Sequence, residues 1–306
     1  MKTMGTIGIS MLVLSTALCC CCAFPFPQVE LPEVTLPTIS VPTIEVGDLQ
    51  EETVSLPLTD TDAVTVQLSF GAGELTVESG PADQLVEAQF RYNVAEWKPE
   101  VTYEDHRLTI EQDEIRNSWG IPSDEVRNEW KLEFSPDVPL DMTIQAGAGN
   151  GELDFGGLQI TDLRMDLGAG DFDIRFNTPS ETTMERLTMN AGAAKLSVVE
   201  LGNAGLKEMT VQGGVGDILL DFTGDWSHSA EVEIIGGVGS FTIQVPDDVG
   251  VHVTVEGISN LDVSGLRRQD DAYVNDAFGE TEIELRIRIT TGLGDVHIIE
   301  VSNEGE

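Results

Sequence analysis

The sequence predicts an all-β protein: a single-stranded parallel β-solenoid (β-helix-like) with coils of about 21–24 residues and an inserted β-rich N-terminal cap. Three observations support this fold class. Segments in which apolar and polar residues alternate recur along the chain, and this period of two is typical of half-buried strands. A Gly-x-Gly turn, or a close variant, stands in the middle of each segment. From Gly149 to Asn260 the second turn position recurs every 21–24 residues, a repeat length that indicates a solenoid.

Each repeat is expected to hold two short strands joined at the glycines. In the unit that contains "LGAGDFDIRF" (167–176), Leu163 and Met165 lie on one side of the first strand, and Arg164 and Asp166 lie on the other. One unit cannot bury its apolar side alone, whereas stacked units share a continuous core. Glycine suits such turns because it tolerates positive φ and the close approach of a neighbouring coil. The predicted turn glycines are Gly71, Gly73, Gly147, Gly149, Gly168, Gly170, Gly192, Gly214, Gly216, Gly237, Gly239, Gly257, Gly292 and Gly294.

Two other interpretations of the glycine turns are weaker. A dinucleotide-binding loop needs a third glycine and a following helix, but Asp173 stands three residues after Gly170 and a strand pattern follows. Calcium-binding turns repeat every nine residues and place their aspartate one position later. Asp171, Asp217 and Asp295 would still form a weak cation-binding column if their coils align. We therefore predict neither a cofactor nor a dedicated metal site.

Residues 1–23 are predicted to be a signal peptide with a cysteine-rich, lipobox-like end. An apolar stretch of secretory length follows an early lysine and is short for a membrane span. All four cysteines of the chain are contiguous at 19–22. Residues 18–21 read Leu-Cys-Cys-Cys, the shape of a bacterial lipobox, which makes Cys21 the candidate for lipidation. Ordinary cleavage after Ala23 and an uncleaved signal anchor are the alternatives.

Residues 24–50 are predicted to form a proline-rich stalk. The pentapeptides LPEVT, LPTIS and VPTIE follow one another, so a proline recurs every fifth residue. Proline at this spacing forbids a helix and favours extended polyproline geometry, at about 3.1 Å per residue. Such a stalk would hold a domain away from a membrane. Alternatively, its apolar positions could lie along the domain as an edge strand.

Residues 51–141 are expected to comprise the first coil and a β-rich cap that interrupts the repeat, followed by the solenoid repeats at 142–302 and an acidic tail at 303–306. Within the cap, strands are predicted at 84–92, 100–103, 107–112 and 129–135. A sheet there would cover the open end of the solenoid and block edge-to-edge association.

Three of the four tryptophans, Trp97, Trp119 and Trp130, fall in or beside this cap. If exposed, they would make a platform for glycans or partner proteins, because aromatic side chains dominate binding surfaces. We favour the capping role over the platform. Trp119 lies in a stretch with Gly120 and Pro122 that is expected to be an exposed loop.

The charge and the scarcity of catalytic motifs narrow the function. The formal net charge of −38 excludes nucleic acid as a partner, because binding to phosphates needs a basic patch. The four histidines, His106, His228, His252 and His297, are scattered and form no HExxH motif. His297 is predicted to lie on an outward strand face. No G-x-S-x-G motif occurs, so we do not expect an enzyme.

The order of motifs resembles a known family. "YNVAEWKPEV" at 92–101, "NEWKLEF" at 128–134 and "DVPLDMTIQAGAGNGELDFGGLQITDLRMDLGAGDFDI" at 137–174, followed by glycine-paired coils, are similar to toast-rack proteins. That family is related to adhesin-like β-solenoid domains and to the C-terminal domain of LiaF-like cell-wall-active antibiotic response proteins. The resemblance covers roughly residues 50–300 and implies a β-solenoid outside the membrane. It supplies no binding residues.

Together these observations predict a non-catalytic, extracytoplasmic scaffold or binding module of the bacterial cell envelope, adhesin-like or envelope-sensing. The expected attachment is to the cell membrane through the N-terminal lipid or signal anchor, with a secreted form as the alternative. An envelope protein or a wall polymer is the expected partner. A second hypothesis is an accessory regulator of an envelope-stress sensor kinase, since LiaF-like proteins belong to such a system. A third is a carbohydrate-active enzyme on a β-helix that uses paired carboxylates.

Overall fold

The computed structural model describes residues 45–59, 63–112 and 125–303. At residues 258 and 259 it describes the backbone alone. The signal segment with Cys21, most of the proline-rich stretch and Trp119 lie outside the described residues. The predictions made for them therefore stay predictions.

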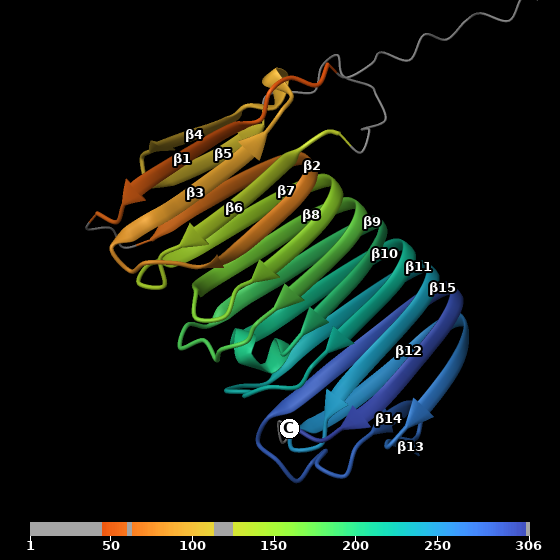
Figure 1. Ribbon diagram of the computed structural model, residues 1–306. Helices are drawn as coiled ribbons and strands as arrows, with labels where there is room; N and C mark the ends of the chain where they lie inside the picture. Colours follow the sequence, from red (N-terminus) through yellow and green to blue (C-terminus); the bar gives the residue numbers. More distant parts are fainter. Residues whose placement is uncertain (1–44, 60–62, 113–124, 304–306) are drawn as a thin grey trace, which may run out of the picture. The chain divides into compact units, whose positions relative to one another are not determined.

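The described residues form a fifteen-stranded sheet with almost no helix, which confirms the all-β class (Figure 1). Two short 3-10 helices interrupt the strands, η1 (Ala95–Trp97) and η2 (Leu201–Ala204). The strands are β1 (Gln50–Pro57), β2 (Val64–Ser79), β3 (Gln84–Tyr92), β4 (Pro99–Glu104), β5 (Arg107–Gln112), β6 (Asn128–Phe134), β7 (Pro139–Asp154), β8 (Gln159–Arg175), β9 (Met184–Val199), β10 (Leu206–Asp221), β11 (Ala230–Pro246), β12 (Gly250–Ser264), β13 (Arg267–Gln269), β14 (Ala272–Val274) and β15 (Glu284–Val301).

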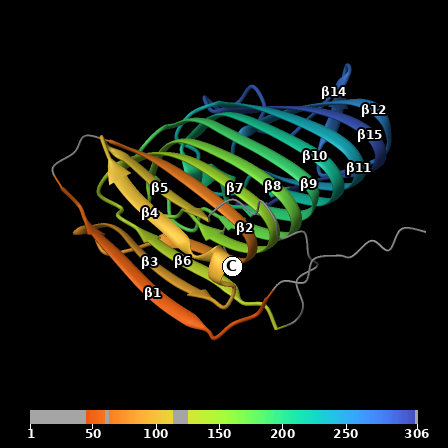
Figure 2. The same cartoon turned by 90° about the horizontal axis from the view of Figure 1, so that it is seen from above.

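Eight long strands, which we call ribs, make up most of the sheet. They are parallel and lie in the order β2, β7, β8, β9, β10, β11, β15, β12. Figure 2 shows each rib bending near its middle, with the bends of neighbouring ribs side by side. The sheet as a whole is mixed, because strands at both of its ends pair antiparallel. At one end these pairs are β1 with β3, β3 with β6, and β4 with β5. At the other end they are β12 with β14 and β14 with β13.

The bends lie at the paired glycines, but each rib is one continuous strand of 15–18 residues rather than the two short strands that we expected. The second glycine of a pair makes this possible. Gly170 has a φ of 140°, and a Cβ atom there would lie 1.8 Å from the carbonyl oxygen of Gly149 on the next rib. A side chain would therefore clash with the backbone, whereas glycine lets the strand bend without losing its neighbours.

The register confirms the repeat spacing along the middle ribs but not at its end. Gly149 faces Gly170 and Gly170 faces Ala194, 21 and 24 residues apart. The last interval of the repeat, from Gly239 to Asn260, does not join neighbouring ribs. Gly239 faces Gly294, because the C-terminal strand β15 lies between β11 and β12.

Opposite charges face each other across this insertion. Arg286 and Arg288 of β15 stand in register with Glu231 and Glu233 of β11. In sequence order β12 would instead place His252 beside Glu231, without a permanent positive charge. Among the described residues no ion pair within 4.0 Å joins β11 to β15, so the attraction acts over a longer distance and is weak.

The core lies inside the bend. Alternate residues of both rib halves point inward, and on β11 these include Ile234 before the bend and Phe241 and Ile243 after it. Residues between the ribs, such as Leu201 of η2 and Phe222, are also fully buried and belong to the same cluster. Burying one such side chain contributes about 1.5–3 kcal/mol, so a core that extends across all ribs stabilises the sheet without a disulfide.

The N-terminal end of the sheet is closed by a rib in two pieces. β5 pairs with the first half of β2 and β6 pairs with its second half. The bounds of β3, β4, β5 and β6 agree with the predicted strands to within one residue.

The tryptophans of this end are internal. Trp97 is 3% exposed and Trp130 is 1% exposed, and Trp130 packs edge-on against Phe70 and Phe90 with ring centroids 5.1 and 5.3 Å away. The hypothesis of an exposed aromatic platform is therefore wrong for these two residues. Their rings give the end of the sheet a core of its own.

Candidate functional site

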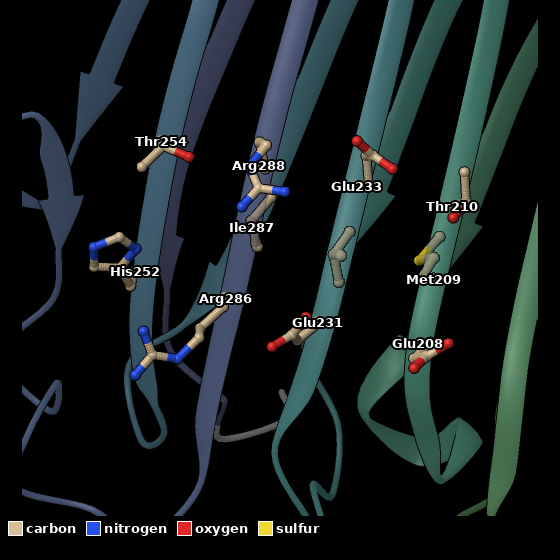
Figure 3. Close-up of a pocket in the computed structure, with 11 residues that line it drawn as sticks. Glu208, Met209, Thr210, Glu231, Glu233, His252, Thr254, Arg286, Ile287 and Arg288 are labelled. Atoms are coloured by element: carbon tan, nitrogen blue, oxygen red, sulfur yellow. The ribbon is translucent and has the colours of Figure 1, made fainter.

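A shallow pocket of about 320 Å³ lies on the outer face of four neighbouring ribs, in the halves that precede the bend (Figure 3). Outward residues of β10, β11, β15 and β12 form two rows there, because in-register parallel strands place equivalent positions side by side at about 4.8 Å. The first row is Glu208, Glu231, Arg286 and His252; the second row is Thr210, Glu233, Arg288 and Thr254.

Arg286 and His252 are held by their surroundings. The Arg286 guanidinium forms an ion pair with Glu284 and lies 6.0 Å from the centre of the Phe278 ring. The ring of His252 packs against the same phenylalanine at a tilt of 43°, with centroids 5.3 Å apart. The Phe278 ring therefore contacts side chains from two neighbouring strands, β15 and β12.

The other charges of the pocket are less constrained. Arg288, Glu231 and Glu233 form no ion pair within 4.0 Å in the described part of the chain, and all three side chains are exposed. Glu208 lies 3.8 Å from Arg186 on β9. A guanidinium binds carboxylates with two parallel hydrogen bonds, and carboxylates bind ammonium groups. The pocket can therefore hold a ligand or a partner surface that carries both charges.

The same pocket lacks the contact that nucleophilic catalysis uses. A hydroxyl nucleophile needs a base within hydrogen-bond reach. Among the described residues, neither Thr210 nor Thr254 forms a side-chain hydrogen bond with His252.

The perturbed carboxyl groups of the molecule lie outside this pocket. Burial, and the nearby carboxylate of Asp141, raise the pKa of Asp162 on β8, against the lowering effect of Arg186. In the cap, hydrogen bonds from Lys98 and Tyr92 lower the pKa of Glu52, while burial and Glu52 raise the pKa of Tyr92 to about 12. These groups couple neighbouring strands and none of them lines the pocket.

The residues predicted from the sequence lie in different parts of the fold, and none of those named below lines the pocket. The turn glycines lie at the bends of the ribs. His297 points outward from β15, as predicted, with Nδ1 3.7 Å from the Asp262 carboxylate. His106 and His228 lie in connections and, like His297, outside the pocket.

The cation column does not form. Asp171, Asp217 and Asp295 share one row, but Lys195 faces Asp171 in the register and Ser240 lies between Asp217 and Asp295. Successive aspartates are thus two strand spacings apart, about 9–10 Å. Calcium bonds measure about 2.3–2.6 Å, so one ion cannot join two of them. No group of three metal-ligating side chains occurs among the described residues.

Sequence reasoning missed the charged pocket because its members come from four separate ribs. Arg286 and Arg288 stand two residues apart on one strand, as do Glu231 and Glu233. That spacing predicts that the two side chains of each pair point to the same face of their strand. It does not predict which strands are neighbours, since β15 is inserted out of sequence order.

The chain matches the family model of the N-terminal domain of toast-rack proteins over residues 45–198 and 180–244. It belongs to the toast-rack family. No curated protein matches the chain at a significant level.

Two solved structures are similar to the chain at low identity. A candidate cell adhesion protein from Clostridium sporogenes is 20% identical, with a TM-score of 0.48 over 83% of this chain and 100% of the other. A candidate adhesin from Bacteroides fragilis is 13% identical, with a TM-score of 0.38 over 83% of this chain and 97% of the other. Among the described residues of the toast-rack chain itself, no helix is long and apolar enough to span a membrane.

Proposed function

We propose that this toast-rack protein is a non-catalytic binding module of the bacterial cell envelope, exported and held at the outer side of the cell membrane by its N-terminal segment. In this proposal each rib corresponds to one coil of a solenoid. The observation that carries it is the outer face: in-register ribs repeat outward side chains at about 4.8 Å and present a charged pocket without a nucleophile–base pair.

The amino-terminal sequence supports the location. The lipobox-like residues 18–21 and the proline-rich repeat precede a domain that needs no disulfide. The net charge of −38 supports an external site as well, since it repels nucleic acid and anionic headgroups and favours contact with cationic or neutral envelope components.

Fractionation of cells tests the location. The wild-type chain is expected in the membrane fraction and to be degraded when protease is added to intact cells. Replacement of all four cysteines at 19–22 by serine is expected to release the protein into the soluble or secreted fraction. Replacement of Ser10 by alanine, within the same segment, is the matched control and should leave the distribution unchanged. Unchanged membrane retention of the serine variant contradicts lipid anchoring.

Cross-linking in intact cells tests the binding role. The charged pocket predicts that Arg286→Ala/Arg288→Ala reduces the yield of cross-linked partner at least several-fold. Arg268→Ala, a change of an exposed arginine on β13 outside the pocket, is the control. Reproducible capture of a sensor kinase would replace the scaffold role by the regulatory one. Equal yields from wild type and the double variant would contradict the assignment of the pocket.

A further inference from the structure

A second concave surface runs across the ribs along the bend, apart from the charged pocket. Two hollows, of about 810 and 310 Å³, share Ala146 and Asp166 and so form one continuous feature, which we call the bend groove. It extends from β2, with β5 at its end, to β11. Six ribs at about 4.8 Å spacing give a length of about 24 Å.

The floor of the groove consists of glycine backbone and of the apolar side chains Phe70, Ala146, Leu167 and Ala191. The first glycines of the bends that line it are Gly71, Gly147, Gly168, Gly192, Gly214 and Gly237. A Cβ atom at Gly168 would lie 2.0 Å from the carbonyl oxygen of Gly147, and positions 147, 192, 214 and 237 are similarly blocked. The glycine positions of the floor therefore cannot carry side chains.

One wall of the groove is polar and almost uncharged. It consists of the residues two positions before the first glycine: Ser69, Gln145, Asp166, Asn190, Gln212 and Ile235. The Asp166 carboxylate already accepts hydrogen bonds from Arg164 and, at 2.5 Å, from Asn190. Within the described residues, the amides of Gln145 and Gln212 have no side-chain hydrogen bond and remain available to a ligand.

A buried amide at the end of the groove also lacks a partner. Gln112 of β5 is 9% exposed, and its Oε1 accepts hydrogen bonds from the Gly71 N–H at 3.2 Å and from Asn128 Nδ2 at 3.1 Å. These two donors fix the orientation of the amide, so Nε2 is the remaining group, and among the described residues it has no hydrogen-bond partner. A buried donor without a partner destabilises the fold, and an acceptor from a ligand would satisfy it.

We propose that the bend groove binds a linear, neutral, hydroxyl-rich polymer, namely a segment of a glycan chain. Only an extended chain fills a groove of this length across repeated ribs. Hydroxyl groups donate and accept, as do the amides of Gln145, Asn190 and Gln212 that line the wall. Anionic polymers are disfavoured by the net charge of −38, and the only carboxylate of the wall is engaged by Arg164 and Asn190.

This inference deepens the proposed function and rests on it for the biological setting only. The test uses the full-length protein on an array of linear oligosaccharides, neutral and anionic, of two to eight residues. We expect neutral chains of six or more residues to be retained, with the dimer of the same sugar bound at least about tenfold more weakly because it spans fewer ribs. An array on which no neutral chain is retained, or on which dimer and hexamer bind equally, overturns the proposal.

Variants locate the site. Gln145→Ala/Gln212→Ala removes two exposed amides of the wall, and Thr143→Ala/Thr188→Ala changes outward residues of β7 and β9 that lie outside the groove. We expect the glutamine variant to weaken binding of the best neutral hexamer at least fivefold by calorimetry, and the threonine variant to leave it unchanged. Equal effects, or tighter binding of a neutral extended hexapeptide than of any glycan, overturn the proposal. Because binding is measured on purified protein, its failure is distinguishable from a failure of membrane localisation.

Discussion

The two ends of the rib sheet are closed in different ways. At the N-terminal end, β5 and β6 cover the two halves of β2, and β3 and β1 extend that layer over buried aromatic rings. At the C-terminal end, β14 pairs only with residues 252–254 of β12. The second half of β12 has β15 on one side and no strand on the other within the described residues. One end therefore has a core of its own, and the other leaves an edge.

The difference teaches that the ribs do not specify their own termination. Every rib has the same bend and alternation, so the repeat alone would continue. The repeat ends instead where other strands follow it: a rib broken into β5 and β6 beside β2 at one end, and the short antiparallel strands β14 and β13 beside β12 at the other.

The largest expected effect comes from the aromatic core of the N-terminal end. Trp130→Ala is expected to cost about 3–5 kcal/mol of the free energy of unfolding, since a fully buried aromatic side chain is removed. Its Nε1 also donates to Asn128 Oδ1 at 3.0 Å. Tyr273→Ala on β14, which is only partly buried, should cost about 1 kcal/mol. Urea unfolding measures both, and equal losses would contradict the contrast between the ends.

The bend of an interior rib gives the next effect. Gly170→Ala is expected to destabilise by about 1–3 kcal/mol or more, because a positive φ and a backbone clash oppose any side chain. Ala194 occupies the equivalent position of the next rib and is the control. Ala194→Gly should change the unfolding free energy by no more than about 1 kcal/mol. If the free energy of unfolding of Gly170→Ala equals that of the wild type, glycine is not required at the bend.

The inserted strand gives a smaller effect. Arg286→Glu/Arg288→Glu places like charges opposite Glu231 and Glu233 and should cost about 1–2 kcal/mol for the two pairs. Hydrogen exchange should then rise in β15 and β12 and not in β2. Reversal of both glutamates to arginine should restore protection. If the four-fold variant exchanges as fast as the double variant, charge does not place β15.

The dependence of stability on pH gives the smallest effect, of opposite sign at the two ends. The pKa of Glu52 in the cap is lowered by Lys98 and Tyr92, so its ionised form stabilises the fold above the ordinary pKa and this contribution is lost as the pH falls. The pKa of Glu300 on β15 is raised by burial and by Asp247 and Asp276, so its ionised form costs stability until acid protonates it.

Two glutamine variants separate these effects. Glu52→Gln should lose less than about 1 kcal/mol at neutral pH and nothing near pH 3, because the ion pair is partly exposed. Glu300→Gln should gain stability at neutral pH and show no difference near pH 3. Urea unfolding at both pH values checks the signs. A gain from Glu52→Gln at neutral pH would contradict the assignment.

The strands were predictable from the sequence where alternation is local. Residues 84–92 and 107–112 were predicted with the bounds of β3 and β5 because each shows a clear period of two. The burial of Trp97 and Trp130 was not predictable in the same way, since it depends on which strands cover which. For the same reason, the insertion of β15 and the charged pocket that it creates with Glu231 and Glu233 needed the register.

Disulfide cross-linking of outward positions tests the order of the ribs most directly. In a chain whose residues 19–22 are serine, Thr242→Cys on β11 is paired either with His297→Cys on β15 or with Asp262→Cys on β12. The account predicts that mild oxidation links positions 242 and 297, which face each other, and leaves 242 and 262 unlinked because β15 lies between them. Efficient linkage of 242 to 262, and none to 297, would contradict it.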